Sequence, residues 1–351
     1  MAAQGVDALL LSLGADLPWL TGYEAMPLER LTMLVLPVDG EATLVIPRLE
    51  AARVVQDPDA FALRPWGELE SPVDVVADLV GARTNLAISD RSWATFLLDL
   101  QKSLPKAHWQ QASRVTSPIR VVKDDAEIAA LIAASAAIDR VAAQLHAGDI
   151  KLIGRTEADV SAEFGHRIVA EGHEKTNFAI VASGPNAASC HHHASDRVIQ
   201  ANEVVLCDFG GTMAGYCSDI TRCVYTGEPP AEFTDLYSIL VASNAAGVAS
   251  GTLGTPCQEV DRASRKVIAD AGYGDYFIHR TGHGIGMEEH EDPYMVEGNV
   301  TPLAHGHAYS VEPGMYFDGK WGMRLEDIVI ATNEGPMLLN HTKRELVVVE
   351  A

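Results

Sequence analysis

Short apolar runs alternate with amphipathic stretches over the first third of the chain. Four runs have the length and composition of buried strands: residues 8–13, 31–36, 43–46 and 85–88. Asp39 and Gly40 form a turn motif between the second and third runs, and residues 93–103 have the pattern of a helix. Strands that alternate with helices in this way predict an α/β domain with a mixed sheet.

A domain boundary is predicted near residues 117–118, just before a strong helix start. Asp124 and Glu127 resemble a capping box, and the apolar spacing after them predicts a helix over residues 125–147. Because this start follows a Ser-Pro pair, we expect the chain to divide into two domains: residues 1–120 and residues 121–351.

An approximate internal repeat runs through the second domain. Each half begins with two helices and ends with a β-hairpin. The predicted elements of the first half are helices at 125–147 and 157–170 and strands at 177–182, 204–209 and 216–225. Those of the second half are helices at 233–249 and 258–271 and strands at 307–317 and 323–331. Two similar halves predict a pseudo-twofold α+β domain with a ligand site between them.

Composition and charge narrow the class of protein. Among 351 residues, 26 Lys and Arg stand against 48 Asp and Glu, which leaves a net charge of −22. This charge repels phosphate groups, so nucleic acid and anionic membranes are not expected as partners. No apolar stretch approaches the roughly 18 to 20 residues of a membrane span, and the five cysteines form no CxxC pair. These features predict a soluble, cytoplasmic protein.

Acidic residues occupy corresponding places in the two predicted hairpins. Asp208 and Asp219 flank a glycine-rich turn in the first hairpin, where antiparallel pairing is expected to bring them side by side. Glu312 and Glu326 lie in the second hairpin, and His283 stands between glycines before it. A single acid beside a turn is typically a turn residue, but four acids in matching positions are harder to explain that way. Crowded carboxylates repel one another unless a cation lies between them, so the set indicates two divalent cations and hydrolytic chemistry.

These motifs, in this order, resemble those of the pita-bread metallopeptidases. The resemblance is strongest to the Xaa-Pro dipeptidases (prolidases) and the related Xaa-Pro aminopeptidases. It rests on five motifs: Ser-Asp-Ile-Thr-Arg at 218–222, His-Arg-Thr-Gly-His-Gly-Ile-Gly at 279–286, His-Glu at 290–291, Val-Glu-Pro-Gly at 311–314 and Arg-Leu-Glu-Asp at 324–327. The first 120 or so residues resemble the creatinase-type N-terminal domain. The resemblance therefore implies an α/β creatinase-like domain followed by an α+β, pseudo-twofold pita-bread catalytic domain.

The resemblance also implies the ligands of two divalent metal ions, most readily Mn2+, with Co2+ or Zn2+ able to substitute. The residues that match the family's metal ligands are Asp208, Asp219, His283, Glu312 and Glu326. Asp219 and Glu326 would bridge both ions. Glu312 would in addition handle protons for the hydroxide that the ions hold.

Further positions match the family's catalytic residues. These are His191, His279, His290 and Arg324, in addition to Glu312; Arg324 would support the bridging carboxylate. Cys190 stands where the family usually has proline, and two more histidines follow His191, so the assignment could shift by one position. His305 and His307 match no family residue, and we expect both at the surface.

The implied reaction is hydrolysis of the peptide bond before proline in Xaa-Pro dipeptides, by a hydroxide bound to two metals. An Xaa-Pro aminopeptidase that acts on longer peptides stays open, although the lack of large insertions favours the dipeptidase. A non-catalytic relative or a metal-independent creatinase would lack ligand residues, which are all present here. We also expect a homodimer that forms through the N-terminal domain, with the apolar segment 19–33 as the contact patch.

Overall fold

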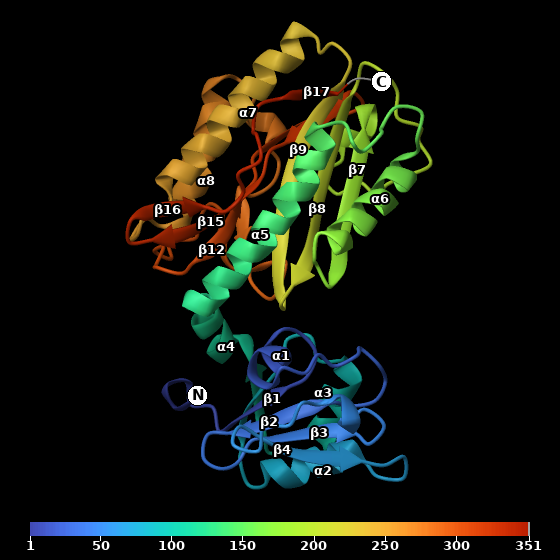
Figure 1. Ribbon diagram of the computed structural model, residues 1–351. Coiled ribbons are helices and arrows are strands. Elements are labelled where there is room, and N and C mark those ends of the chain that lie inside the picture. The colour runs from blue at the N-terminus through green and yellow to red at the C-terminus, as the bar shows by residue number, and fades with distance from the viewer. Residues whose placement is uncertain (350–351) are drawn as a thin grey trace. The chain divides into compact units, whose positions relative to one another are not determined.

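The computed structural model describes residues 1–349 of the chain. The chain forms two compact units that divide between Arg120 and Val121 (Figure 1). Each unit has its own sheets and its own buried apolar clusters, which is the hallmark of a separate domain.

The first unit is built on one six-stranded mixed sheet. Its strands are β1 (Ala8–Leu11), β2 (Met33–Pro37), β3 (Thr43–Pro47), β4 (Ala62–Trp66), β5 (Asn85–Ile88) and β6 (His108–Gln111). Its helices are α1 (Asp16–Thr21), α2 (Pro72–Val80), α3 (Ala94–Ser103) and α4 (Ser113–Arg120), with short turns η1 (Ala2–Gln4) and η2 (Ala51–Arg53). In the order β4-β3-β2-β1-β5-β6, β1 lies between an antiparallel and a parallel neighbour. The predicted α/β fold with a mixed sheet is confirmed.

The segment 19–33 is only partly available for a contact with another chain. Tyr23 and Met33 are buried in their own unit, and the Tyr23 hydroxyl donates a hydrogen bond to Glu50. Met26 and Leu28 remain exposed, at 43% and 40%. The expectation that the whole segment forms a free apolar patch is therefore wrong, because part of it completes the local core. The homodimer itself stays a prediction.

Over residues 121–349, the second unit contains four long helices and three sheets. Its helices are α5 (Asp125–His146), α6 (Glu157–Ala170), α7 (Ala231–Ser250) and α8 (Cys257–Asp270), with short turns η3 (Gly184–Ala188) and η4 (Gly274–Tyr276). The four-stranded sheet contains β7 (Lys175–Ser183), β8 (Val204–Met213), β9 (Tyr216–Thr226) and β17 (Val347–Val349). The five-stranded sheet contains β10 (Gly282–Gly284), β11 (Glu291–Met295), β12 (Ala308–Val311), β15 (Asp327–Thr332) and β16 (Gly335–Leu338), and β13 (Gly314–Phe317) pairs with β14 (Trp321–Arg324).

Helix α5 begins at the predicted capping box. The Asp124 side chain accepts hydrogen bonds from the backbone of Ala126 and Glu127, and Glu127 accepts one from the backbone of Asp124. Contrary to the expectation that no stretch approaches a membrane span, α5 is long and apolar enough to cross a membrane by length and composition. However, Ile138 and Leu145 are fully buried in the cluster formed with β8 and β9, across which α5 lies (Figure 1). This packing is that of a core helix.

Alternation along β8 separates two faces of the four-stranded sheet. Cys207 and Phe209 pack in the cluster formed with α5 and α6, whereas Val204 and Leu206 pack in the cluster formed with α7. Because side chains alternate along a strand, Asp208 shares the face of Val204 and Leu206. The carboxylate therefore points away from α5 and α6.

The second predicted hairpin is wrong in detail, since both of its strands are broken. Strand β12 ends before Glu312 and β13 begins after Pro313, while Glu326 separates β14 from β15. Proline lacks the N–H that a continuous ladder requires, so the pairing changes partner here. β12 pairs with β15 in the large sheet, and β13 pairs with β14 alone. Glu312 and Glu326 consequently lie at strand ends, where their side chains are not confined to one face of a ladder.

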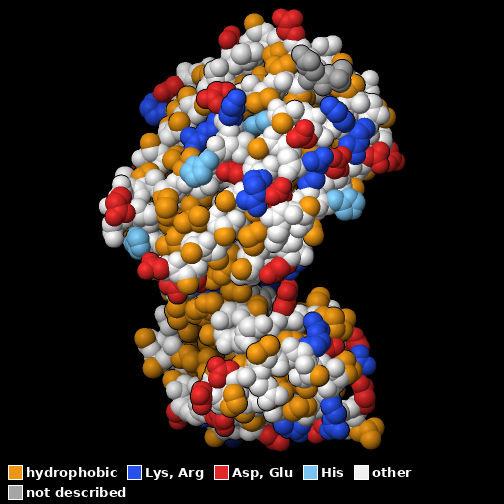
Figure 2. Space-filling view, in the orientation of Figure 1, with side chains coloured by type: hydrophobic (Ala, Val, Ile, Leu, Met, Phe, Trp, Pro, Cys, Tyr) orange, Lys and Arg blue, Asp and Glu red, His pale blue; other side chains and the backbone are white. Residues whose placement is uncertain are grey.

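The net charge of −22 is not concentrated in one patch on the visible face. Figure 2 shows Asp and Glu side chains spread over it, with Lys and Arg side chains among them. The repulsion of polyanionic partners therefore arises from charge spread over this face and not from one acidic patch.

His307 is buried, contrary to the expectation of a surface position, whereas His305 is exposed. The backbone N–H of Ala304 donates a hydrogen bond to His307 Nδ1 at 3.3 Å, which requires a neutral ring. Burial, with a smaller contribution from the charge of Lys123, lowers the pKa of His307 from 6.5 to about 4. The hydrophobic pattern of the sequence does not predict the burial of His307, because residues distant in the sequence cover it.

We expect His307 to make the unfolding free energy depend on pH. As the pH falls below 6.5, the unfolded chain binds a proton that the folded protein excludes until about pH 4, so folding stability decreases across this window. His307→Asn keeps an acceptor for Ala304 but cannot titrate. Between pH 7 and pH 5 the parent should lose about 1–2 kcal/mol more than the variant in urea unfolding. The exposed His305→Asn should follow the parent, and parallel curves for His307→Asn and the parent would contradict the prediction.

Candidate active site

A cavity of about 590 Å³ in the second unit is lined by every residue expected at the site. These residues are Asp208, Asp219, His283, Glu312, Glu326, His191, His279, His290 and Arg324. The remaining lining residues are Phe178, Ile180, Cys190, Arg280 and Glu289. The lining comes from both halves of the unit, as the predicted repeat requires.

Strands β8 and β9 place the two aspartates on one face. Asp208 lies opposite Thr221 and Asp219 lies opposite Gly210, so the aspartates are diagonal neighbours and not the direct pair that was expected. A Cβ atom at Gly210 would come within 2.2 Å of the Ser218 carbonyl oxygen. Glycine at this position therefore permits the close approach of the two strands beside Asp219.

Three buried side chains form a cluster suited to a metal ion. One ligand atom from each of Asp219, His283 and Glu326 lies within 4.8 Å of the others. His283 Nε2 lies 3.2 Å from Glu312 Oε1 and 3.8 Å from Asp219 Oδ2. Glu312 therefore adjoins the cluster through His283.

The carboxylates of this cluster lack enough hydrogen-bond donors. Within residues 1–349, no donor reaches the buried Asp208 Oδ1, Asp219 Oδ1 or Glu326 Oε1. Burial, and after it the neighbouring carboxylates, raise the pKa of Asp219 and Glu326 well above the usual range. Buried, unpartnered anionic oxygens are expensive unless they coordinate a cation, and oxygens with one imidazole suit a hard or borderline divalent ion. The residues present thus fit a metal centre.

Arg324 holds the edge of the acidic cluster in place. Its guanidinium donates hydrogen bonds to the Asp208 carboxylate, to Thr221 Oγ1 at 3.1 Å and to the Tyr316 hydroxyl at 2.8 Å. Thr221 Oγ1 in turn donates to Glu326 Oε2 at 2.7 Å. Arg324 therefore contacts Asp208 directly and reaches the expected bridging carboxylate of Glu326 only through Thr221.

The three consecutive histidines have different surroundings. His191 lines the cavity. His192 Nε2 lies 2.8 Å from Glu157 Oε2, outside the cavity, and His193 is exposed and does not belong to the lining. The geometry thus gives no reason to shift the assignment away from His191.

The other two cavity histidines are held in neutral form. His279 Nε2 lies 2.9 Å from the Tyr316 hydroxyl, and the His290 ring lies 3.8 Å from that of His283. Burial lowers the pKa of His279, and burial together with the charge of His283 lowers the pKa of His290 to about 4. Neutral imidazoles can donate one hydrogen bond and accept another.

Residues that the sequence did not single out complete the cavity. Phe178 and Ile180 come from β7, where the spacing of two residues places both on one face. Arg280 stacks on the Tyr294 ring, with its guanidinium carbon 4.3 Å from the ring centroid. In the described part of the chain, Arg280 forms no ion pair with a carboxylate. In the sequence, the position of Arg280 next to His279 indicates that Arg280 lies near the site.

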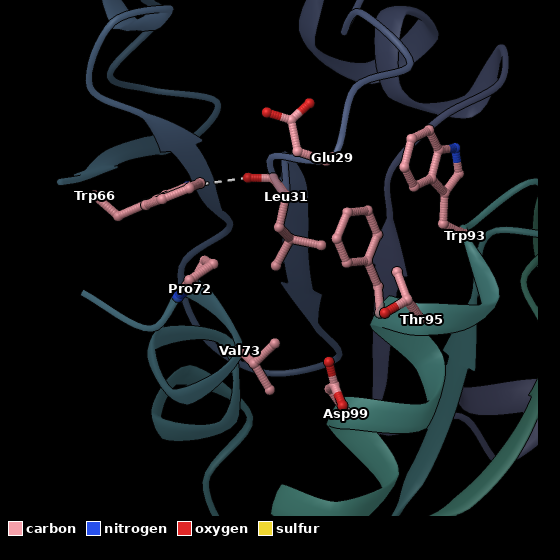
Figure 3. A pocket seen from close by; sticks show the side chains of 9 residues that line it. Glu29, Leu31, Trp66, Pro72, Val73, Trp93, Thr95 and Asp99 are labelled. Carbon is pink, nitrogen blue, oxygen red and sulfur yellow. Dashed lines mark hydrogen bonds between the residues drawn. The ribbon is translucent and has the colours of Figure 1, made fainter. Parts of the chain in front are cut away.

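A second cavity, of about 400 Å³, lies in the first unit (Figure 3). Figure 3 shows Leu31, Trp66 and Trp93 around it and the carboxylates of Glu29 and Asp99 at its edges. The indole of Trp66 donates to the Leu31 carbonyl at 2.9 Å. The lining contains no histidine or cysteine, so it offers neither a mixed metal-ligand set nor a strong nucleophile.

Comparison with known proteins agrees with this geometry. The family model of the Creatinase/Prolidase N-terminal domain matches residues 1–122, and that of metallopeptidase family M24 matches residues 128–333. A probable dipeptidase PepE from Mycobacterium tuberculosis is 43% identical over 353 residues, with 99% of this chain and 93% of the relative covered. An Xaa-Pro dipeptidase from Lactobacillus delbrueckii subsp. lactis is 33% identical over 363 residues, with 98% and 95% covered.

A solved structure supports the same assignment. The crystal structure of a recombinant prolidase from Thermococcus sibiricus superposes with a TM-score of 0.94 at 34% identity, with 99% of this chain and 96% of that chain covered. The match to the M24 model spans more than half of the chain and includes all lining residues of the larger cavity. The chain therefore belongs to metallopeptidase family M24, as an enzyme of the dipeptidase and prolidase group with a Creatinase/Prolidase N-terminal domain.

Proposed function

We propose that the protein is an Xaa-Pro dipeptidase that uses two divalent metal ions. The observation that carries this proposal is the buried acidic cluster whose oxygens lack donors, in a cavity with neutral histidines and one unpaired arginine. When bound, the two ions would lower the pKa of a water molecule and polarise the scissile carbonyl. Manganese is the proposed metal, and Co2+ or Zn2+ could substitute.

The proposed ligands divide by their surroundings. Asp219 and Glu326 lie in the three-residue cluster with His283, and each would serve as a ligand to both ions. Asp208, which likewise has one oxygen free of donors, and His283 would each hold one ion. Glu312 accepts a hydrogen bond from Ser310 Oγ at 3.0 Å, which orients its carboxylate for ligation and for proton transfer to the leaving nitrogen of proline.

Three cavity histidines would act on the substrate. The peptide bond before proline has no N–H, so its carbonyl oxygen is the polar atom by which the site can orient it. His191, His279 and His290 line the cavity, and a neutral imidazole can donate to that oxygen as charge develops on it. Arg324 is committed to Asp208, Thr221 and Tyr316 and would position the cluster rather than the substrate.

Arg280 favours a dipeptide over a longer peptide. A dipeptide that ends in proline carries a free carboxylate next to the scissile bond, whereas an aminopeptidase substrate has an amide there. Arg280 lines the cavity, and its guanidinium is stacked on Tyr294 without a carboxylate partner among the described residues. Guanidinium groups bind carboxylates with two parallel hydrogen bonds, so Arg280 matches the free carboxylate. Homodimeric assembly and a cytoplasmic location stay predictions from the sequence.

The first prediction concerns the carboxylate of the substrate. With added Mn2+, kcat/KM for an Xaa-Pro dipeptide should exceed that for the matching Xaa-Pro amide by about 10- to 100-fold, the scale of a charge-assisted hydrogen bond. Arg280→Gln should remove this preference by slowing only the free acid, while Arg262→Gln, an exposed arginine bound to Glu259 and Glu297, should retain it. Equal or faster cleavage of an Xaa-Pro-Yaa tripeptide by the parent would instead indicate an aminopeptidase.

The second prediction separates metal ligands from residues that act on the substrate. Asp219→Ala and Glu326→Ala should lose both bound metal and activity, because each removes a bridging ligand. His290→Ala should keep its metal and lose about 10²-fold or more in kcat, as when one charge-stabilising donor is removed. Metal analysis of the purified variants, together with kcat, checks this division. A His290→Ala protein as poor in metal as Asp219→Ala would show that His290 belongs to the ligand set.

A further inference from the structure

Glu157 is a fully buried carboxylate outside the cavity, at the start of α6. Its Oε1 accepts hydrogen bonds from the backbone and hydroxyl of Ser183 at 2.8 and 2.7 Å. Its Oε2 accepts from the backbone and hydroxyl of Ser195 at 3.1 and 2.7 Å and from His192 Nε2 at 2.8 Å. The Asn186 amide donates to both oxygens at 3.1 Å. Glu157 therefore gathers four side chains from the last residue of β7 and the segment that follows it.

This carboxylate stays ionised under all working conditions. Burial alone would raise its pKa, but the donors of Ser195, Ser183 and His192 outweigh burial and lower the pKa of Glu157 to about 2. An ionised group that is fully satisfied by converging donors fixes the geometry of those donors. The segment around residues 183–195 is consequently held by one charge.

The held segment carries a cavity histidine. Arg324 donates to the Cys190 carbonyl at 3.2 Å, and Glu157 holds the ring of His192. His191 lies between these two anchored neighbours and lines the cavity. Glu157 thus determines where His191 stands without touching it.

The second half of the unit repeats this arrangement on the corresponding helix. Asp261 of α8 is buried, at 1% exposure, and accepts from the Thr281 backbone at 2.9 Å and from Arg265 at 2.9 and 3.0 Å. Arg265 donates onward to the carbonyls of Phe277 and His279 at 2.8 and 2.7 Å. The segment that carries His279 is therefore clamped to a buried carboxylate in the same manner.

A buried carboxylate often only holds a loop in the folded state. The placement of Glu157 and Asp261 relative to the cavity histidines is therefore needed to distinguish a positioning role from a stabilising one. In the described chain, neither Glu157 nor Asp261 forms a hydrogen bond with a proposed metal ligand. Each lies on the second helix of its half. Glu157 holds the His192 ring next to His191, and Asp261 holds the Arg265 guanidinium that donates to the His279 carbonyl. A purely stabilising role does not require this correspondence.

We propose that Glu157 and Asp261 are positioning residues for the two histidines that face the substrate, His191 and His279 respectively. Within residues 1–349, the metal ligands form no hydrogen bond with the Glu157 network, so loss of Glu157 leaves the metal centre intact. Asp261 reaches one ligand by a second route, because the Thr281 carbonyl accepts from the Glu312 N–H at 2.8 Å, so metal content is measured for Asp261→Asn as well. This inference rests on the roles of His191 and His279 in the proposed function.

The test is a set of double-mutant cycles measured with an Xaa-Pro dipeptide. Glu157→Gln keeps the size of the side chain but turns one acceptor into a donor that faces other donors. It should lower kcat/KM about 10- to 100-fold, mainly through kcat, because misplacement by about 1 Å has effects of this size. In a His191→Ala background the same change should have no further effect, whereas with His279→Ala the two losses should multiply. Asp261→Asn should show the reverse dependence.

Matched controls come from the same two helices. Glu163→Gln on α6 and Glu259→Gln on α8 alter carboxylates bound to Arg155 and Arg262, outside the cavity, and should leave kcat and metal content unchanged. Should Glu157→Gln not fold, Ser195→Ala removes one hydroxyl donor of the same network and enters the cycle instead.

Different results would contradict the positioning role of the carboxylates and the substrate role of the histidines. Retained activity of Glu157→Gln, a loss of its bound metal, or equal losses with and without His191 would each overturn the positioning role. Full activity of His191→Ala and His279→Ala would instead refute the histidine roles in the proposed function. Losses that vanish in the matched histidine background and persist in the other one, with metal content at the parent level, would support the inference.

Discussion

The fold concentrates negative charge in its interior, and this constraint governs the catalytic unit. Asp208, Asp219 and Glu326 each leave one buried oxygen without a donor. Removing one partner from a buried ion pair typically costs several kcal/mol, so a cluster of this kind does not persist for the sake of stability. The protein supplies Arg324 as its own positive partner, and bound cations would balance the rest.

The two halves of the unit deliver these acids to one point and are joined there. Thr221 of β9 forms an isolated bridge with Glu326, both through the backbone and through its hydroxyl. Immediately beside it, Arg222 and Asp327 form a fully buried ion pair at 2.7 Å. Because these contacts cross between the halves next to the cluster, movement of one half relative to the other would separate the acids. The rigidity of the site therefore comes from the same residues that connect the repeat.

Much of this could be predicted because local rules and tertiary structure agree. The capping box at Asp124 starts α5, and the helix predicted over residues 157–170 has those bounds in the structure. The residue types and order of the motifs were enough to collect the lining of the cavity. The break at Glu312 has a sequence signal in Pro313, which the apolar pattern alone overlooks, whereas no proline or glycine marks the break at Glu326. Glu157 also looked ordinary, since an acid in the first turn of a helix is common.

Buried carboxylates of this unit have pKa values shifted in opposite directions. Glu157 is as buried as the cluster, yet its oxygens are surrounded by donors and its pKa is lowered to about 2. Burial, and after it the neighbouring carboxylates, raise the pKa of Asp219 and Glu326, and too few donors are present to offset them. A satisfied buried carboxylate fixes the geometry around it, whereas an unsatisfied one has coordination capacity left for a ligand. Since all these acids are buried, the completeness of their hydrogen bonds thus distinguishes the acid that we propose to position the site from those that we propose to hold metals.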